Sequence, residues 1–241
     1  YEPERWRESL RVLDGLTGWI EMHIEQARVL QDTGNRVGIV TAIAGYVHAD
    51  VIVHGRGDHA GATPMDFRLD PGPPVAESIL ELERLARAAG KGTVGTVGEI
   101  EVHPSLINAI PERIRFSLDV RGVDEEAYRG VARDIGAFAE QAAKRRGMTA
   151  DVRERQTLAP TPLDTRIVAA LESAARSTGE PMMLMPSGAA HDTMCVADHV
   201  PSAMVFVPCK EGISHSPLEH AEPADAALAA EIILNAIRAL A

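Results

Sequence analysis

The sequence has few cysteines and no hydrophobic run that approaches the roughly 20 residues of a membrane span. Cys195 and Cys209 are its two cysteines, and they have no CxxC spacing. Two cysteines are too few for a disulfide framework, so we expect buried free thiols. No signal peptide opens the chain. These absences predict a cytoplasmic protein that does not bind membranes.

The chain has fewer basic than acidic residues. The chain has 24 Lys and Arg against 35 Asp and Glu, a formal net charge of −11. A chain this acidic, in which no Lys/Arg cluster is interleaved with aromatic residues, is a poor candidate for binding nucleic acid. With 241 residues and 45% apolar content, it can bury the core of one large domain or of two smaller ones.

The hydrophobic pattern divides the chain into segments 1–38, 39–156 and 157–241. Residues 4–33 have helical spacing up to Gly34, which predicts a helix with His23 on or beside it. Residues 39–156 follow the order strand, helix, strand, strand, helix, strand, which predicts a ferredoxin-like α+β domain. In the last segment helices alternate with short apolar strands, which indicates part of an α/β sheet.

The expected elements of the middle segment have approximate bounds. They are a strand or hairpin at 38–57, a helix at 75–89, strands at 93–102 and 112–120, a helix from the N-cap Asp124 to about 146, and a strand at 148–155.

Two histidines lie in short polar contexts that packing does not readily explain. His23 opens His23-Ile-Glu-Gln26, and His215 lies in the loop Gly212–His220. They are too far apart in sequence for a local zinc finger, so a shared metal would require the fold to bring the two ends together and make the middle an insertion. Imidazole suits Zn²⁺, Mn²⁺, Co²⁺ or Ni²⁺. Taken alone, His23 is more often a helix-surface or core-edge residue.

Six motifs follow one another along the chain. They are His23-Ile-Glu-Gln26, Gly57-Asp-His-Ala-Gly-Ala-Thr-Pro-Met65 with Arg68 and Asp70, Asn108-Ala-Ile-Pro111, Asp119-Val-Arg121, Ser187-Gly-Ala-Ala-His-Asp192 and Gly212-Ile-Ser-His-Ser-Pro217. In this order they resemble the amidase branch of the M20 metallopeptidase-like family, which comprises N-carbamoyl-L-amino-acid hydrolases, allantoate amidohydrolases, ureidoglycolate-type hydrolases and β-ureidopropionases. The resemblance covers essentially the whole chain.

The resemblance implies an α/β catalytic domain with two divalent metals, interrupted by a ferredoxin-like domain that serves as lid and homodimer interface. By the family's pattern His23 would be a ligand of one metal and His215 a ligand of the other. Two adjacent metals can polarise a carbonyl and supply a hydroxide for hydrolysis. The expected substrate is a small molecule with a carboxylate.

The same resemblance implies roles for five further residues. Arg121 would hold the substrate carboxylate, since a guanidinium matches carboxylate geometry, and Asn108 would donate a hydrogen bond to the same end. His59 would stabilise the oxyanion, reaching into the partner subunit's site. Gln26 and His191 would contact the substrate. The plainer alternatives are a solvated Arg at a strand end and an Asn in a turn.

The chain also departs from the family's pattern. Ala27 and Ala190 stand where glycine is usual, which puts the shape of the pocket in doubt. The family's upstream His-x-Asp motif, bridging Asp and Glu-Glu pair are absent, and His23 and His215 alone cannot complete a two-metal site. We therefore expect the C-terminal part of an amidohydrolase, inactive by itself. The alternatives are a non-catalytic dimerisation or carboxylate-binding module, and a peptidase or N-acyl deacylase of the wider family.

Overall fold

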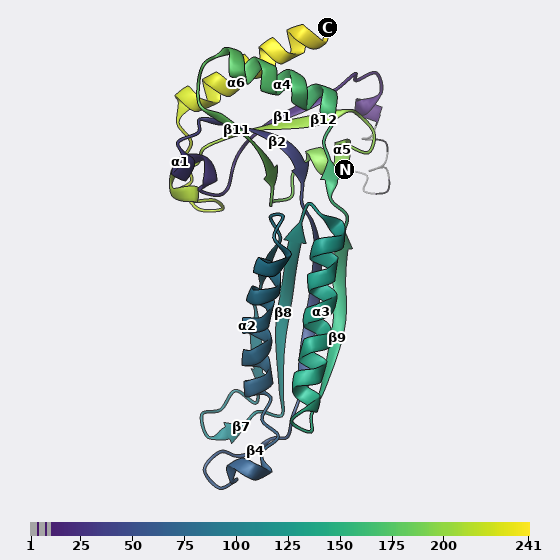
Figure 1. The fold of residues 1–241 in the computed structure, drawn as a ribbon, viewed down its shortest axis with the longest axis vertical. Helices are drawn as coiled ribbons and strands as arrows, with labels where there is room; N and C mark the ends of the chain where they lie inside the picture. Colours follow the sequence, from purple (N-terminus) through teal and green to yellow (C-terminus); the bar gives the residue numbers. More distant parts are fainter. Residues whose placement is uncertain (1–3, 5–7, 9–10) are drawn as a thin grey trace. The chain divides into compact units, whose positions relative to one another are not determined.

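The computed structural model describes residues 4, 8 and 11–241, which divide into two compact units (Figure 1). The first unit combines the residues up to Ala44 with Thr161–Ala241, and the second is Gly45–Pro160. Helices and strands are mixed in both units, which agrees with the predicted mixture of α/β and α+β structure. In the described part of the chain, no helix is long and apolar enough to cross a membrane.

The first unit contains one five-stranded sheet. Its strands are β1 (Trp19–Ile24), β2 (Val37–Ile43), β10 (Thr161–Pro162), β11 (Met182–Ser187) and β12 (Ser202–Val207). β1 runs parallel to β12, β12 antiparallel to β2, and β2 parallel to β11, while β10 pairs antiparallel with β2. β12 is buried along its whole length and fixes the position of β1 at the edge of the sheet.

The prediction of one helix over residues 4–33 is wrong where the structure can test it. Residues 19–33 form β1 and the short helix α1 (Val29–Thr33) instead. Helical spacing is a local signal, whereas all six residues of β1 pair with β12, and such tertiary pairing overrides local propensity. Residues 5–7 and 9–10 of the predicted helix lie outside the described residues. His23 is therefore a strand residue.

The two faces of this sheet are covered differently. Helices α4 (Thr165–Ser177) and α6 (Pro223–Leu240) lie side by side over one face and bury a core with it. The other face carries Met204 and Phe206, which pack against residues from α1 and α5 (Thr193–Val196). Because strand side chains alternate, β1 turns Ile20 toward the helices and His23 toward the second face.

The second unit has the predicted order of elements. They are β3 (Gly45–His54), α2 (Gly72–Ala89), β5 (Val94–Thr96), β6 (Ile100–His103), β8 (Arg113–Gly122), α3 (Glu125–Lys144) and β9 (Thr149–Leu158). The sheet order is β5-β8-β3-β9, and β6 also pairs with β8. Alternate residues of β3 and β8 are buried against α2 and α3, so that the two helices and the sheet share one core.

The boundary between the units differs from the predicted one. The expected strand or hairpin at 38–57 is two strands, and Ala44 separates β2 of the first unit from β3 of the second. Gly45 opens β3, where a Cβ would lie 2.5 Å from the carbonyl oxygen of Leu158. The division therefore falls at Gly45 and Pro160 rather than at residues 39 and 156. The expected strand at 93–102 is likewise broken into β5 and β6.

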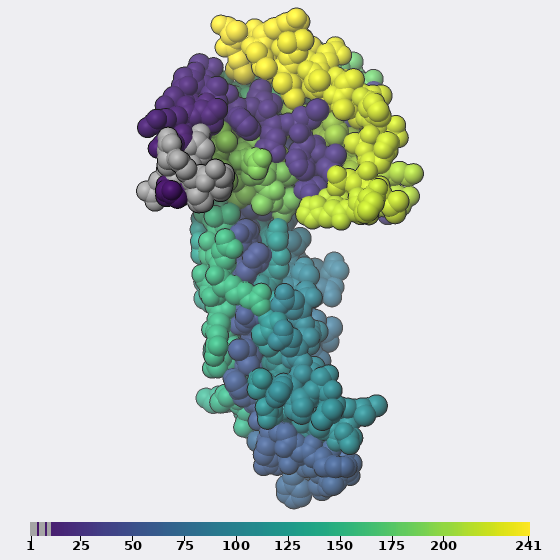
Figure 2. Space-filling model, turned by 180° about the vertical axis from the view of Figure 1, so that it is seen from behind, coloured from purple at the N-terminus to yellow at the C-terminus, as the bar shows by residue number. Residues whose placement is uncertain are grey.

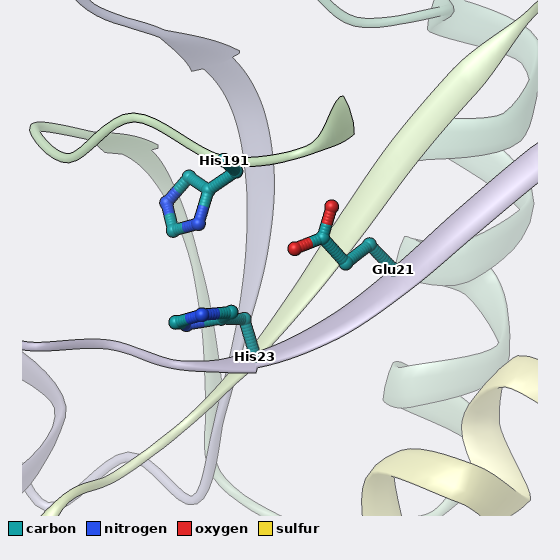
Figure 3. Close-up of side chains that lie close together, drawn as sticks. All are labelled: Glu21, His23 and His191. Carbon is teal, nitrogen blue, oxygen red and sulfur yellow. The ribbon is translucent and has the colours of Figure 1, made fainter. Parts of the chain in front are cut away.

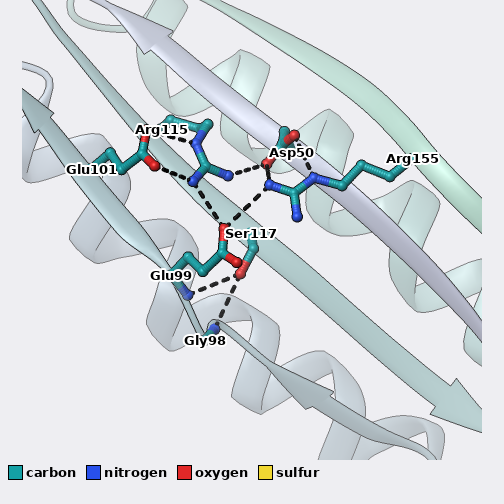
Figure 4. Close-up of polar contacts among 7 residues, drawn as sticks. All are labelled: Asp50, Gly98, Glu99, Glu101, Arg115, Ser117 and Arg155. Carbon is teal, nitrogen blue, oxygen red and sulfur yellow. Dashed lines mark hydrogen bonds and ion pairs between the residues drawn. The ribbon is translucent and has the colours of Figure 1, made fainter.

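A charged network covers the sheet face of the second unit that lies opposite its helices (Figure 4). Arg115 and Arg155 both donate hydrogen bonds to Asp50, and Arg115 also donates to Glu99 and Glu101. Partial burial would raise the pKa of Asp50, but the hydrogen bonds from the two guanidinium groups outweigh it and hold that pKa below its usual range. The network links four neighbouring strands across the exposed face.

Candidate metal centre

Three side chains with metal-ligand chemistry converge on the second face of the first unit's sheet. Glu21 and His23 share this face because they are two positions apart on β1. His191 reaches them from the loop between β11 and α5, and ligand-type atoms of all three lie within 4.8 Å of one another (Figure 3). The two imidazole rings meet edge to face with their centroids 4.7 Å apart. Among the described residues, this is the one His, Cys, Asp and Glu group with such spacing.

A hydrogen bond determines which nitrogen of His23 can bind a metal. His23 Nδ1 lies 2.8 Å from the carbonyl oxygen of Ile24, which can only accept a hydrogen bond. Nδ1 therefore carries the proton, and Nε2 of the neutral ring keeps its lone pair.

Ser187 selects the tautomer of His191. His191 Nε2 lies 2.7 Å from Ser187 Oγ, and the hydroxyl of Ser187 donates to the carbonyl oxygen of Ala189 at 3.1 Å. The hydroxyl oxygen is thus left to accept from Nε2–H, so that Nδ1 keeps its lone pair. Burial lowers the pKa of His191, and the neighbouring His23 lowers it further. Both effects favour the neutral imidazole, which is the form that binds metals.

Glu21 is held by a residue at the start of α5. Its Oε2 accepts hydrogen bonds from Thr193 N at 2.9 Å and from Thr193 Oγ1 at 2.6 Å. Trp19 Nε1 donates to the same hydroxyl at 3.1 Å. Sequence patterning did not indicate Glu21, because helical spacing predicted His23 on a helix, where residues two apart point in different directions. The alternation along Trp19–Ile24 was the signal that could have identified it.

Gln26 and His215 form a second group in the first unit. Gln26 Nε2 donates to Ser214 Oγ at 3.0 Å and lies 3.3 Å from His215 Nε2. The two residues follow β1 and β12, whose carboxyl ends lie at the same edge of the sheet because the strands are parallel. Both have left-handed backbone, with φ of 60° for Gln26 and 54° for His215. Such conformations are uncommon outside glycine and concentrate at functional sites.

In the second unit the structure brings His59 and Asn108 together. They lie at a two-stranded sheet of β4 (Asp58–His59) and β7 (Ala109–Ile110), and both line one open pocket. His59 Nδ1 accepts hydrogen bonds from the backbone N–H groups of Gly61 and Ala62, each at 3.1 Å. The ring proton of His59 is therefore on Nε2, which is left as a hydrogen-bond donor.

Exposed apolar side chains occur close to His59 and Asn108 in the sequence. The segment around residues 58–70 lies at the surface, as the blue end of the second unit in Figure 2. Met65 and Phe67 are 74% and 69% exposed, and Ile107 is fully exposed. Apolar surface of this kind is typical of a contact region.

Arg121 lies at the opposite end of β8 from this pocket. Its Nε and Nη2 each donate to the carboxylate of Asp119 at 2.7 Å, and its guanidinium lies 5.5 Å over the ring of Tyr46. The hydrogen bonds to Asp119 raise the pKa of Arg121, although partial burial acts against them. β8 is ten residues long, so Arg113 and Arg121 lie roughly 26 Å apart at about 3.3 Å per residue. One small substrate therefore cannot contact both Arg121 and His59 of a single chain.

The donor atoms of the first unit fit a divalent transition metal. Two neutral imidazoles and one carboxylate are a ligand set that Zn²⁺ takes in catalytic sites, with a fourth position open for water or substrate. His215 lies outside the group that contains His23, and the prediction gave these two histidines to different metals. The three side chains together could supply ligands to one ion.

Comparisons with known proteins agree with the predicted resemblance. The chain is 40% identical over 240 residues to an N-carbamoyl-L-amino acid amidohydrolase of Geobacillus stearothermophilus, which covers 100% of this chain and 58% of that relative. It is 33% identical over 244 residues to an allantoate deiminase of Arabidopsis thaliana, over 90% of this chain and 46% of that relative. The chain thus spans about half the length of these curated relatives.

A solved structure and a family profile extend the agreement to the fold. The crystal structure of a putative amidohydrolase/peptidase from Burkholderia cenocepacia superposes with a TM-score of 0.87 at 34% identity, over 92% of this chain and 54% of that one. The profile of peptidase family M20/M25/M40 matches residues 9–239. Since this match includes every motif of the resemblance, the chain belongs to the peptidase family M20/M25/M40.

Proposed function

We propose that this chain is part of a metal-dependent amidohydrolase that cleaves a linear amide or ureido C–N bond of a small carboxylate substrate, such as an N-carbamoyl-L-amino acid or allantoate. The observation that carries the proposal is His23, whose Nε2 lone pair is set up for a metal on the face that also holds His191. The names of the relatives support the reaction class.

The first unit would hold the metals and the reacting end of the substrate. His23 and His215 would each bind a divalent ion of the Zn²⁺, Mn²⁺, Co²⁺ or Ni²⁺ type, while Gln26 and His191 face the substrate. A bound ion would polarise the scissile carbonyl and activate a water molecule. Further ligands and the general base would come from outside these 241 residues, so we expect no activity from the chain alone.

The second unit would act as the lid that recognises the substrate. Arg121 would bind the carboxylate, which would share or replace Asp119 as its hydrogen-bonding partner. Asn108 would hydrogen bond to the substrate, and His59 would donate from Nε2–H to the oxyanion of the tetrahedral intermediate. The fixed tautomer of His59 supports this role, because a neutral ring can donate without having to lose or gain a proton.

The separation of His59 and Arg121 supports a homodimer in which each site combines residues of two copies. β6 lies at an edge of the second unit's sheet and exposes Ile100 (54%) and Val102 (38%). Pairing of two such edges across a two-fold axis would cover both the apolar side chains and the open backbone groups. We expect a dimer in sedimentation, and a monomer at micromolar concentration would contradict this arrangement.

We also propose that the protein is cytoplasmic. Cys195 and Cys209 are free thiols in the structure, and the expectation of burial is wrong for Cys195, which is exposed, while Cys209 is buried. The reducing cytoplasm maintains free thiols.

Activity measured in two forms of the protein tests the proposal. One form is the chain alone. The other is a fusion of this chain to the part of the Geobacillus stearothermophilus relative that the chain does not cover. Each form would be supplied with Mn²⁺ or Zn²⁺. We expect ammonia release from N-carbamoyl-L-amino acids or allantoate by the fusion only. The matched variant Arg121→Lys keeps the charge but loses the bidentate geometry, and we expect it to raise KM more than it lowers kcat.

Other outcomes would favour the alternatives. Cleavage of dipeptides or N-acyl amino acids, without cleavage of ureido substrates, would indicate a peptidase or deacylase. No turnover of any substrate, together with retained binding of a carboxylate ligand, would indicate a non-catalytic binding module. Metal-dependent ammonia release by the chain alone would refute the expectation that its site is incomplete.

A further inference from the structure

We infer that Arg68 is a positioning residue for His59, and that it acts through the single peptide unit between Ala60 and Gly61. The inference rests on the proposed function in that His59 is the oxyanion donor there. It goes beyond that function by giving a task to Arg68, a residue of the motif that begins at Gly57 and that the proposed chemistry does not otherwise use.

The guanidinium of Arg68 reaches back over the loop that follows β4. Its Nη2 donates to the carbonyl oxygen of Ala60 at 2.5 Å, and its Nε donates to that of Thr63 at 3.0 Å. Arg68 is half-buried, whereas Met65 and Phe67 beside it are exposed. Among the described residues, Arg68 forms these two hydrogen bonds and no ion pair. Its charge is therefore directed at two backbone carbonyls of the loop.

The carbonyl of Ala60 connects Arg68 to the ring of His59. This carbonyl and the N–H of Gly61 belong to one planar peptide unit, and the N–H donates to His59 Nδ1 at 3.1 Å. A cation that is hydrogen-bonded to the oxygen of an amide draws electron density from its nitrogen, which makes the N–H a stronger donor. The guanidinium, the peptide unit and the imidazole thus form one continuous hydrogen-bond chain.

The carbonyl of Thr63 serves to hold the loop. Because the next residue is Pro64, the peptide unit after Thr63 has no N–H to donate. Thr63 N donates to the carbonyl oxygen of His59 at 3.1 Å, which closes a turn, and Ala60 N donates to the carbonyl oxygen of Asn108 at 2.9 Å. The loop is thereby attached to the segment that forms the other side of the pocket.

The hydrogen-bond chain favours the ring tautomer that the oxyanion needs. A second N–H, that of Ala62, donates to Nδ1 of His59 at 3.1 Å. With two N–H groups directed at it, Nδ1 is an acceptor and the ring proton lies on Nε2. The other tautomer would set a proton on Nδ1 against both N–H groups and would leave Nε2 with none to donate. Arg68 adds to this preference because it strengthens one of the two donors.

NMR of the chain tests the hydrogen-bond chain without any activity assay. At about pH 8, where an ordinary histidine is neutral, we expect the ring of His59 to be protonated on Nε2 alone. Arg68→Ala should give a mixture of both tautomers, and the amide proton of Gly61 should move upfield as its hydrogen bond to the ring weakens. Guanidinium chloride, at concentrations too low to unfold the protein, should restore the parent signals in this variant.

A conservative variant covers the case in which Arg68→Ala does not fold. Arg68→Lys keeps the charge but loses the planar guanidinium, whose two donors reach two carbonyls at once. We expect its His59 and Gly61 signals to lie between those of the parent and those of a chain without the cation.

Arg56→Ala is the matched control for loss of charge in the same loop. Arg56 Nε donates to Asp58 Oδ2 at 2.7 Å, and Arg56 Nη2 donates to the carbonyl oxygen of Phe67 at 3.0 Å. Neither acceptor belongs to a peptide unit that donates to His59. Arg56→Ala should therefore keep the tautomer of His59 and the amide shift of Gly61 that the parent shows.

Kinetics of the fusion protein extend the test to catalysis. Removal of one oxyanion donor costs about 10²–10³ in kcat, and we expect His59→Ala to fall in that range. Arg68→Ala should lower kcat by about 10–100-fold and leave KM within about threefold, since it displaces the donor without removing it. Added to His59→Ala, the same change should cost less than about threefold, because a residue that acts through His59 then has nothing to position.

Three results would overturn the inference. They are a parent ring of His59 that is protonated on Nδ1, equal NMR changes in Arg68→Ala and Arg56→Ala, and losses of kcat that multiply in the double variant. The proposed function fails separately, if the fusion of the parent chain cleaves no ureido or amide substrate. The NMR measurements would then still decide whether Arg68 sets the tautomer of His59.

Discussion

Gly212 lies where the loop after β12 passes the loop after β1, and replacing it should disturb both. Its φ is +67°, and a Cβ at this position would lie 2.6 Å from Arg28 Cγ and 2.9 Å from the carbonyl carbon of Ala27. The Arg28 side chain can move away, but the backbone of Ala27 can do so only if the loop shifts. Because Gln26 precedes Ala27 and His215 follows Gly212, Gly212→Ala should separate the Gln26–His215 pair.

The loss of stability expected for Gly212→Ala has two parts, and a control variant separates them. A left-handed alanine costs about 1–2 kcal/mol, and forcing a methyl group against fixed atoms costs about 1–3 kcal/mol more. Gly179 has a φ of +74°, and a Cβ added there would meet no heavy atom within 4 Å, so Gly179→Ala should show the first part only.

Urea unfolding at 25 °C gives the free energy of unfolding of both variants. We expect Gly212→Ala to lose roughly 2–5 kcal/mol, which is the sum of the two parts, and to change the NMR signals of the His215 ring. An equal loss of stability in the two variants, with His215 unchanged, would refute the close approach of the loops.

Three further predictions concern the second unit. Asp124 Oδ1 accepts a hydrogen bond from Ala127 N at the start of α3. Asp124→Ala should therefore lower the free energy of unfolding in urea by about 0.5–2 kcal/mol. An equal loss in Asp124→Asn would show that the charge of Asp124 matters rather than its capping hydrogen bond. The pKa of Asp50 is below its ordinary value in the folded protein, so its contribution to stability is present above the unfolded pKa of about 3.9 and is lost as the pH falls through the folded pKa. Acid unfolding should accordingly depend less steeply on pH in Asp50→Asn than in the parent, and identical curves would argue against the Arg115 and Arg155 contacts. Finally, ¹⁵N NMR at neutral pH should show His59 with its proton on Nε2, and a proton on Nδ1 would remove the proposed oxyanion donor.

Signals that depend on neighbours in sequence predicted much of the fold. The alternating burial of β8 and the Asp124 cap of α3 appear where the sequence indicates them, because one buried face and one capping side chain are local requirements. Helix α4 lies in the last segment, where the pattern predicts helices alternating with strands, and Asp164 caps its first turn. The order of six motifs was specific enough to identify the family, and the comparisons confirm it.

The sequence by itself determined the family, the element order of the second unit and the residue types able to bind a metal. Tertiary structure decided that β1 is a strand, because its conformation depends on pairing with β12, far away in the chain. That one assignment put Glu21 beside His23 and brought His191 over both. It also decided that His59 and Arg121 lie apart, since the length of β8 separates them. Distances between side chains of distant segments follow from packing, which local periodicity does not encode.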